Sequence, residues 1–256
     1  MDRLTPLAAA FLDAEDADPT ASLAIGSFAV FEGPAPSYDE LVELIAGRLP
    51  LIPRYRQRLA PAPFDLAPPA WVDDPAFDLR WHLRNTALPA PGGPDEVGRL
   101  LTRVMTRRMD RSRPLWEYWL CEGLEGGRWA LLSKLHHCLV DGVSGTDIYR
   151  LVLDPTPEPR PGVADDWSPA TPGSLLLTAG ALGHLVTSPV AAGRAFARSL
   201  SAPRALLRHT LESARGALAL TGALRPVHPS TLSGDLSGSR RYAWVDVPLD
   251  DVKRVG

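Results

Sequence analysis

The chain has 256 residues, of which 45% are hydrophobic, and its formal net charge is −3. This length suits one large domain or two small domains with a buried core, and the small negative charge argues against a nucleic-acid partner. Only two cysteines, Cys121 and Cys138, are present, so we expect a reducing, cytoplasmic location rather than a disulfide framework.

The first predicted elements, in chain order, are one strand and two helices. Residues 23–31 have strand composition. Ser37 and Glu40 have the spacing of a capping box, which predicts a helix start. Pro94 predicts the start of a second helix. The apolar side chains of this second helix are spaced at i, i+3, i+4, i+7 and i+8, and they are Val97, Leu100, Leu101, Val104 and Met105.

A β-hairpin is predicted in the middle of the chain. Residues 115–122 and 128–137 have strand composition, and the Leu-Glu-Gly-Gly stretch between them predicts a turn. A further helix is expected at 142–153. This order of elements favours an α+β fold, with helices on one side of a largely antiparallel sheet.

Composition divides the chain into four predicted regions. Residues 1–160 are expected to form an N-terminal domain, and residues 161–173 a proline-rich linker. Residues 174–224 are expected to be a basic, amphipathic helical region. Residues 225–256 predict a strand and then the start of a helix near Leu249.

The basic region has two interpretations. Residues 174–224 contain five arginines and one acid, Glu212, among many alanines and leucines. Such a segment can lie on a membrane or lipid-droplet surface. Alternatively, its helices pack on the domain and leave the arginines in water. The sequence leaves both alternatives open.

The stretch KLHHCLVDG at 134–142 carries the candidate chemistry. If strand alternation continues to the end of the hairpin, His136 and His137 face opposite ways, so a shared metal site is not expected. One histidine should then be structural and the other a general base, although both can also be ordinary histidines at the core edge. Asp141 is either a second catalytic group or, as we favour, a buried carboxylate that pins the loop. Gly142 suits a tight bend.

No protein nucleophile is evident. The stretch GVSGT at 142–146 misses the G-x-S-x-G pattern by one position, and Cys138 is better explained as a small buried thiol. A base without a protein nucleophile suggests that the substrate itself, an alcohol or an amine, is the nucleophile.

HHCLVDG resembles the HHxxxDG motif of the coenzyme A-dependent acyltransferase superfamily. Five further stretches are similar to the bacterial wax ester synthase/diacylglycerol acyltransferase family. These are LTPLAAAFL at 4–12, LPLIPRYRQRLA at 49–60, WVDDPAFDLRWHLR at 71–84, LPAPGG at 88–93 and MDRSRPLWEYWLCEGLEGGRWALLSKLHH at 109–137. The resemblance is close over roughly residues 1–160 and looser beyond.

The resemblance implies a fold, a reaction and residue roles. The fold is a chloramphenicol acetyltransferase-like α/β sandwich. The reaction transfers a fatty acyl group from acyl-CoA, the co-substrate, to diacylglycerol or a long-chain alcohol, with no other cofactor. His137 is the implied general base, His136 is accessory, and Asp141 and Gly142 shape the loop. The family's PLW motif corresponds to a run that we interpret as structural: Pro114, Leu115 and Trp116.

The chain departs from the family in one respect. Family members are about twice as long, and their second half carries an Asn-Asp motif, whereas no asparagine follows Asn85 here. We therefore expect the first half of such an enzyme, with its last helix cut short. The alternatives are an inactive remnant that binds lipid surfaces or a complementary C-terminal half, and an acyltransferase that uses a protein-borne thioester.

Overall fold

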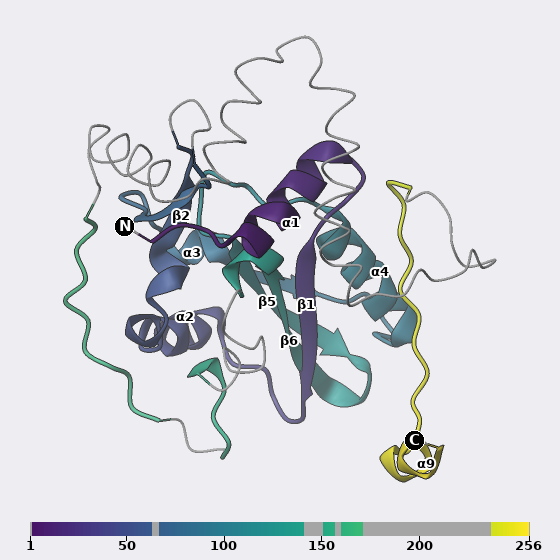
Figure 1. Cartoon of the computed structure of the whole chain (residues 1–256). Coiled ribbons are helices and arrows are strands. Elements are labelled where there is room, and N and C mark those ends of the chain that lie inside the picture. The colour runs from purple at the N-terminus through teal and green to yellow at the C-terminus, as the bar shows by residue number, and fades with distance from the viewer. Residues whose placement is uncertain (1, 63–66, 141–150, 157–159, 171–236, 256) are drawn as a thin grey trace.

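The structure, a computed structural model, describes residues 2–62, 67–140, 151–156, 160–170 and 237–255 (Figure 1). Its α-helices and strands are α1 (Pro6–Ala17), β1 (Ala24–Phe31), α2 (Tyr38–Ala46), β2 (Gln57–Ala60), β3 (Ala70–Asp73), α3 (Leu79–His82), β4 (Leu83–Ala87), α4 (Pro94–Thr106), β5 (Trp116–Leu124), β6 (Arg128–His136) and α9 (Leu249–Val255). Short 3-10 turns include η1 (Leu49–Leu51), η2 (Pro53–Arg56), η4 (Glu125–Gly127) and η5 (His137–Leu139).

The main sheet has four strands in the order β1-β6-β5-β4. The β1–β6 and β5–β6 pairs are antiparallel, and β4 runs parallel to β5. The predicted hairpin is thus confirmed as β5–β6, and the α+β class with a largely antiparallel sheet is confirmed as well. A separate two-stranded sheet, β2–β3, lies between the two helices that were predicted from Ser37 and Pro94, where no strand was predicted. Its strands are four residues long, too short to give a clear alternation pattern.

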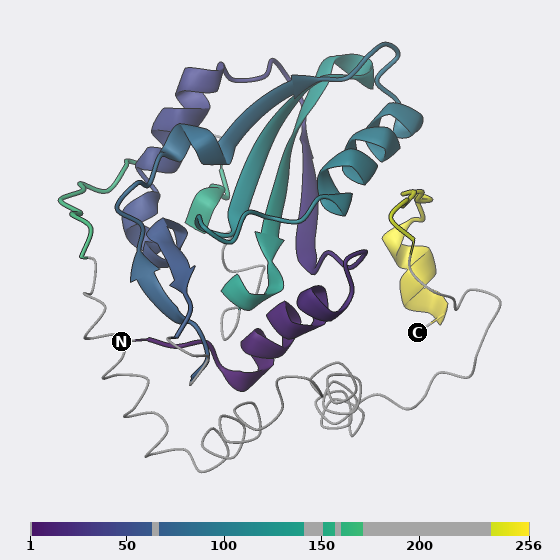
Figure 2. The same ribbon diagram turned by 90° about the horizontal axis from the view of Figure 1, so that it is seen from above.

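Helices cover both faces of this sheet, so the prediction of helices on one side was wrong. Side chains alternate along β6: Leu131 and Leu135 pack in a core cluster with α1 and α2, whereas Ala130 and Leu132 pack in a second cluster with α4. Figure 2 shows α2 and α4 on opposite sides of the sheet. Because the strand is apolar on both faces, both faces must be covered.

Local signals placed two helix starts correctly. Ser37 Oγ accepts from the Glu40 backbone N–H at 3.2 Å, and Glu40 Oε2 accepts from the Ser37 N–H at 2.7 Å, so the capping box of α2 is formed. Helix α4 starts at Pro94 as predicted. Helix α1 was not predicted, although Thr5 caps it with Pro6 at the first helical position, a recognisable start signal.

The C-terminal predictions have mixed outcomes. Helix α9 begins at Leu249 as expected, but residues 242–247 pair with no strand in the described part of the chain. The expected helices of residues 174–224 lie outside the described residues, as does most of the one expected at 142–153. The described linker residues, 161–170, contain no helix or strand.

His82 is a buried ionisable side chain that packs against the larger core cluster. It is 1% exposed, its ring stacks on Trp116 with centroids 4.5 Å apart, and its Nδ1–H donates to the Trp116 carbonyl at 2.8 Å. Loss of solvation on burial lowers the pKa of His82 from 6.5 to about 4. Between about pH 6.5 and pH 4, the imidazole of His82 is therefore neutral in the folded protein but protonated in the unfolded chain.

Stability should consequently fall as the pH drops from about 6.5 to about 4. In that pH range the unfolded state binds a proton at His82 and the folded state does not. This difference lowers the free energy of unfolding by on the order of 3 kcal/mol at most. The test is denaturant unfolding of the wild type and His82→Phe at pH 7 and pH 4. Phe keeps a stacked ring but cannot titrate, so its loss of stability should be smaller. Equal losses in the two proteins would contradict the prediction.

Candidate active site

The two histidines lie at the end of the sheet where β1 and β5 begin. The His136 N–H donates to the Leu115 carbonyl and the His137 N–H donates to the Leu23 carbonyl, both at 3.0 Å. Strand β6 ends at His136, and His137 opens the turn η5. Strand alternation therefore does not set the direction of the His137 side chain, and both histidine rings contact helix α1.

His136 is the buried member of the pair, with 1% of its surface exposed. Its Nδ1 accepts from the backbone N–H of Cys138 at 3.1 Å. Its Nε2 lies 3.4 Å from Oε2 of Glu15, a residue of α1. Packed in this way, the ring is closed to a ligand, which fits the accessory role predicted for it.

Glu15 is itself 2% exposed. Its Oε1 accepts from the Leu23 N–H at 2.7 Å, and its Oε2 accepts from Arg111 at 3.0 Å. Burial acts to raise the pKa of this carboxyl group, but the adjacent His136 ring and the hydrogen bonds from Leu23 and Arg111 outweigh it and lower the pKa to about 2. Glu15 is therefore a buried anion near neutral pH.

His137 is only half-buried. Its ring stacks on Phe11 of α1, with centroids 4.6 Å apart and planes inclined by 22°. Burial, and then the neighbouring His136, lower the pKa of His137 below its usual 6.5. A neutral, accessible imidazole at pH 7 can accept a proton, as a general base must.

Of the other residues in the HHCLVDG stretch, the structure describes Cys138 but not Asp141 or Gly142. Asp141 and Gly142 lie outside the described residues, so their predicted roles in the loop stay predictions. Cys138 is 2% exposed, and burial raises the pKa of its thiol to about 12. That thiol stays protonated at pH 7, which suits a packing role and not a nucleophile.

Pro114, Leu115 and Trp116 lie where β5 begins. Leu115 and Trp116 have no exposed surface. The Trp116 indole N–H donates to the Tyr55 carbonyl at 2.7 Å, and the Leu115 carbonyl holds the backbone of His136. These contacts support the structural interpretation of the PLW run, because they connect the core to the backbone of the histidine turn.

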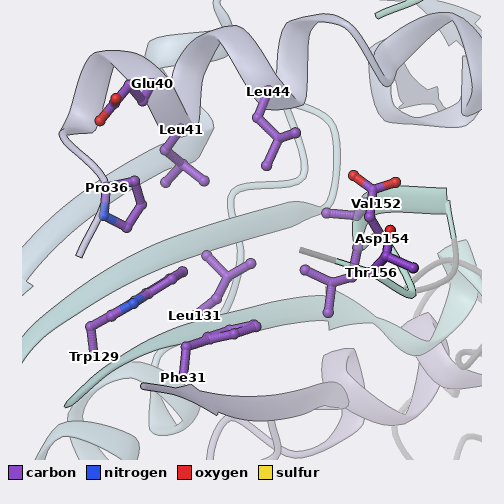
Figure 3. Close-up of a pocket in the computed structure, with 11 residues that line it drawn as sticks. Phe31, Pro36, Glu40, Leu41, Leu44, Trp129, Leu131, Val152, Asp154 and Thr156 are labelled. Atoms are coloured by element: carbon purple, nitrogen blue, oxygen red, sulfur yellow. The ribbon is translucent and has the colours of Figure 1, made fainter. Parts of the chain in front are cut away.

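A pocket of about 240 Å³ lies between α2 and the other end of the sheet (Figure 3). Trp129, in its wall, is seven residues along β6 from His136, roughly 23 Å at about 3.3 Å per residue. The pocket is therefore remote from the histidine pair. Its lining residues are Phe31, Pro36, Glu40, Leu41, Leu44, Trp129, Leu131, Val152, Leu153, Asp154 and Thr156.

Sequence reasoning missed two contributors from α1, Phe11 and Glu15. A signal was present for Glu15, because it extends the buried stripe of Ala8 and Leu12. An acid on the apolar face of a helix indicates a buried carboxylate with partners. Within the described ranges, no group of three or more His, Cys, Asp or Glu side chains is arranged to hold a metal ion.

The comparisons with known proteins identify a family. Residues 4–256 match the family model of the wax ester synthase/diacylglycerol acyltransferase catalytic domain. The chain is 38% identical over its whole length to the probable diacylglycerol O-acyltransferase tgs1 of Mycobacterium tuberculosis, and it covers 53% of that protein. It is 36% identical over 222 residues to the probable diacylglycerol O-acyltransferase tgs3 of the same organism, covering 86% of this chain and 82% of that relative.

A solved structure supports the fold. The wax ester synthase/diacylglycerol acyltransferase from Marinobacter aquaeolei VT8 superposes with a TM-score of 0.53 at 32% identity, over 64% of this chain and 40% of that one. The chain spans about half the length of tgs1. From the family model and these relatives, the chain belongs to the wax ester synthase/diacylglycerol acyltransferase family.

Proposed function

We propose that this chain supplies the general base of an acyl-CoA-dependent O-acyltransferase. The substrates are a fatty acyl-CoA and either diacylglycerol or a long-chain alcohol, and the products are free CoA and triacylglycerol or a wax ester. The observation that carries the proposal is His137, a half-buried imidazole with a lowered pKa in the family's HHxxxDG sequence. The names of the relatives supply the substrate class.

The reaction follows from the chemistry of that imidazole. The neutral ring nitrogen of His137 accepts the hydroxyl proton while the alcohol oxygen attacks the thioester carbonyl. The C–O bond forms, the C–S bond breaks, and the thiolate of CoA takes the proton back from His137. A positioned base of this kind typically contributes about 10²–10⁴-fold in rate. Holding two substrates together contributes much of the remainder.

The direct test supplies the purified chain with palmitoyl-CoA and either dioleoylglycerol or hexadecanol. Free CoA is followed with a thiol reagent, and the ester by mass spectrometry. Because tgs1 extends well beyond the matched region, a second arm adds the purified C-terminal half of a full-length family member. Ester formation in either arm supports the proposal. Failure in both arms contradicts it and favours the alternative of a lipid- or half-binding remnant.

We further propose a cytoplasmic protein with peripheral contact to anionic lipid surfaces. Both cysteines are free and buried, which suits a reducing compartment. Among the residues that the structure describes, no helix is both long and apolar enough to cross a bilayer. The support for surface contact is the five arginines against one acid in residues 174–224, since each basic residue near an anionic surface contributes about 1 kcal/mol.

In a flotation assay, the chain should rise with vesicles that contain anionic phospholipid at low salt. Binding should disappear at about 1 M salt, where the Debye length is only about 3 Å. Replacing the five arginines of residues 174–224 by glutamine should abolish flotation. As a matched control, five exposed arginines among the described residues are replaced by glutamine, and flotation should persist. Absence of flotation at low salt would support the packed-helix alternative.

A further inference from the structure

Helix α1 contacts both histidines from a single face. Phe11 stacks on the His137 ring, and Glu15, four residues later, faces the His136 ring at 3.4 Å. Residues four apart share one face of a helix, so one rigid element holds the pair. The HHxxxDG sequence itself contains neither α1 residue.

The hydrogen bonds around His136 determine where its proton lies. The Cys138 backbone N–H donates to Nδ1, so Nδ1 carries no hydrogen while that bond stands. A neutral imidazole then carries its proton on Nε2, and Nε2 is the atom nearest the Glu15 carboxylate. The backbone N–H selects this tautomer by a hydrogen bond. The Glu15 carboxylate favours it by its negative charge, since its 3.4 Å contact with Nε2 lacks hydrogen-bond geometry.

Two hydrogen bonds hold the Glu15 carboxylate in place beside His136. Its two oxygens accept from the Leu23 N–H, at the approach to β1, and from Arg111, just before β5. Arg111 is also held by Asp16, whose oxygens lie 2.9 and 3.0 Å from Nη1. The carboxylate therefore joins α1 to both strands beside the histidine turn, whereas the side-chain hydrogen bonds of Asp16 to described residues are with Arg111.

We propose that Glu15 is a positioning residue of this active site: it holds His136 as the Nε2–H tautomer and thereby fixes the turn that presents His137. The chain of contacts runs from Glu15 to the His136 ring, from that ring to the Cys138 N–H, and so to the backbone of η5. This inference rests on the proposed function only for its catalytic consequence. The tautomer of His136 is a property of the folded chain, whatever reaction follows.

The test compares Glu15→Leu and Glu15→Gln with Asp16→Asn in the full chain. Leu removes every polar contact at nearly the same volume, and Gln keeps one carbonyl acceptor but loses the charge. Asp16→Asn is the matched control, because it changes the same arginine without touching His136. Ring nitrogen shifts of ¹⁵N-labelled histidine report the tautomer directly, with His136 assigned from a His136→Gln spectrum.

The wild type and Asp16→Asn should show one His136 tautomer, with the proton on Nε2. Glu15→Leu should show a mixture of tautomers and faster exchange of the Nε2 proton, and Glu15→Gln should fall between. In the acyltransfer assay, Glu15→Leu should lower kcat by about tenfold to a hundredfold, the size typical of losing a partner that orients a functional histidine. KM should change little, and Asp16→Asn should leave kcat within about twofold.

Two outcomes would overturn the inference. One is an unchanged His136 tautomer in both Glu15 variants, and the other is a rise in KM with kcat unchanged. If Glu15→Leu fails to fold, the same two measurements on Glu15→Gln decide whether the inference stands. If the wild type makes no ester in either arm of the assay, the proposed function fails while the nitrogen shifts still decide the role of Glu15.

Discussion

His137→Ala is expected to lower the turnover of ester synthesis by at least about two orders of magnitude. In the proposed reaction, the imidazole removes the proton from the attacking hydroxyl group, and a positioned general base supplies about 10²–10⁴-fold. The side chain is half-buried and makes one ring stack, on Phe11. The folded state should survive its loss, because such a stack contributes only about 0.5–1.5 kcal/mol.

His136→Ala is the control variant for this prediction. His136 is only 1% exposed, so its loss should reduce turnover less than the loss of His137. The measurement is kcat in whichever arm of the assay is active, with far-ultraviolet circular dichroism to check the fold of both variants. Equal losses in two folded variants would contradict the assignment of the base to His137.

Trp116→Ala is expected to cause the largest loss of stability among single changes in the PLW run. The indole has no exposed surface, stacks between Tyr55 and His82 at 4.4 and 4.5 Å, and donates to the Tyr55 carbonyl. Removing a buried aromatic side chain costs roughly 3–5 kcal/mol. At about 2–4 °C per kcal/mol for a domain of this size, Tm should fall by roughly 6–20 °C.

Trp244→Ala is the matched control for this change. Trp244 is 44% exposed, so its removal should alter stability by no more than about 0.5 kcal/mol. Thermal unfolding followed by circular dichroism measures both variants under the same conditions. A Trp116→Ala protein with wild-type Tm and no ester synthesis would show that the PLW run contributes to chemistry and would refute its structural interpretation.

Some of this structure was predictable because its causes are local. A capping box needs only a serine and a glutamate three positions apart, and Ser37 and Glu40 form it. A hairpin needs two strand-forming runs and a turn, and β5 and β6 are joined at Gly126 and Gly127, both with positive φ. The family also was evident from short runs of sequence, since HHCLVDG and the PLW stretch stand close together.

The strand order of the sheet and the packing of helices on its faces depend on contacts between segments that are distant in sequence. Strand β4 pairs in parallel with β5, and no pattern within its five residues, Leu83–Ala87, indicates that partner. The prediction of helices on one side failed for a related reason. Alternation shows that both faces of β6 are apolar, but only the tertiary structure shows that α4 covers one face while α1 and α2 cover the other.

At the site, the sequence alone determined which side chains can do chemistry: two adjacent histidines at a strand end, with no protein nucleophile beside them. The tertiary structure decided how they differ. His136 is closed off because Glu15, more than a hundred residues earlier in the chain, lies against its Nε2, and His137 is left half-open because the strand ends one residue before it. A charged neighbour that far away in sequence is set by how α1 packs on the sheet, which no local pattern of residues specifies.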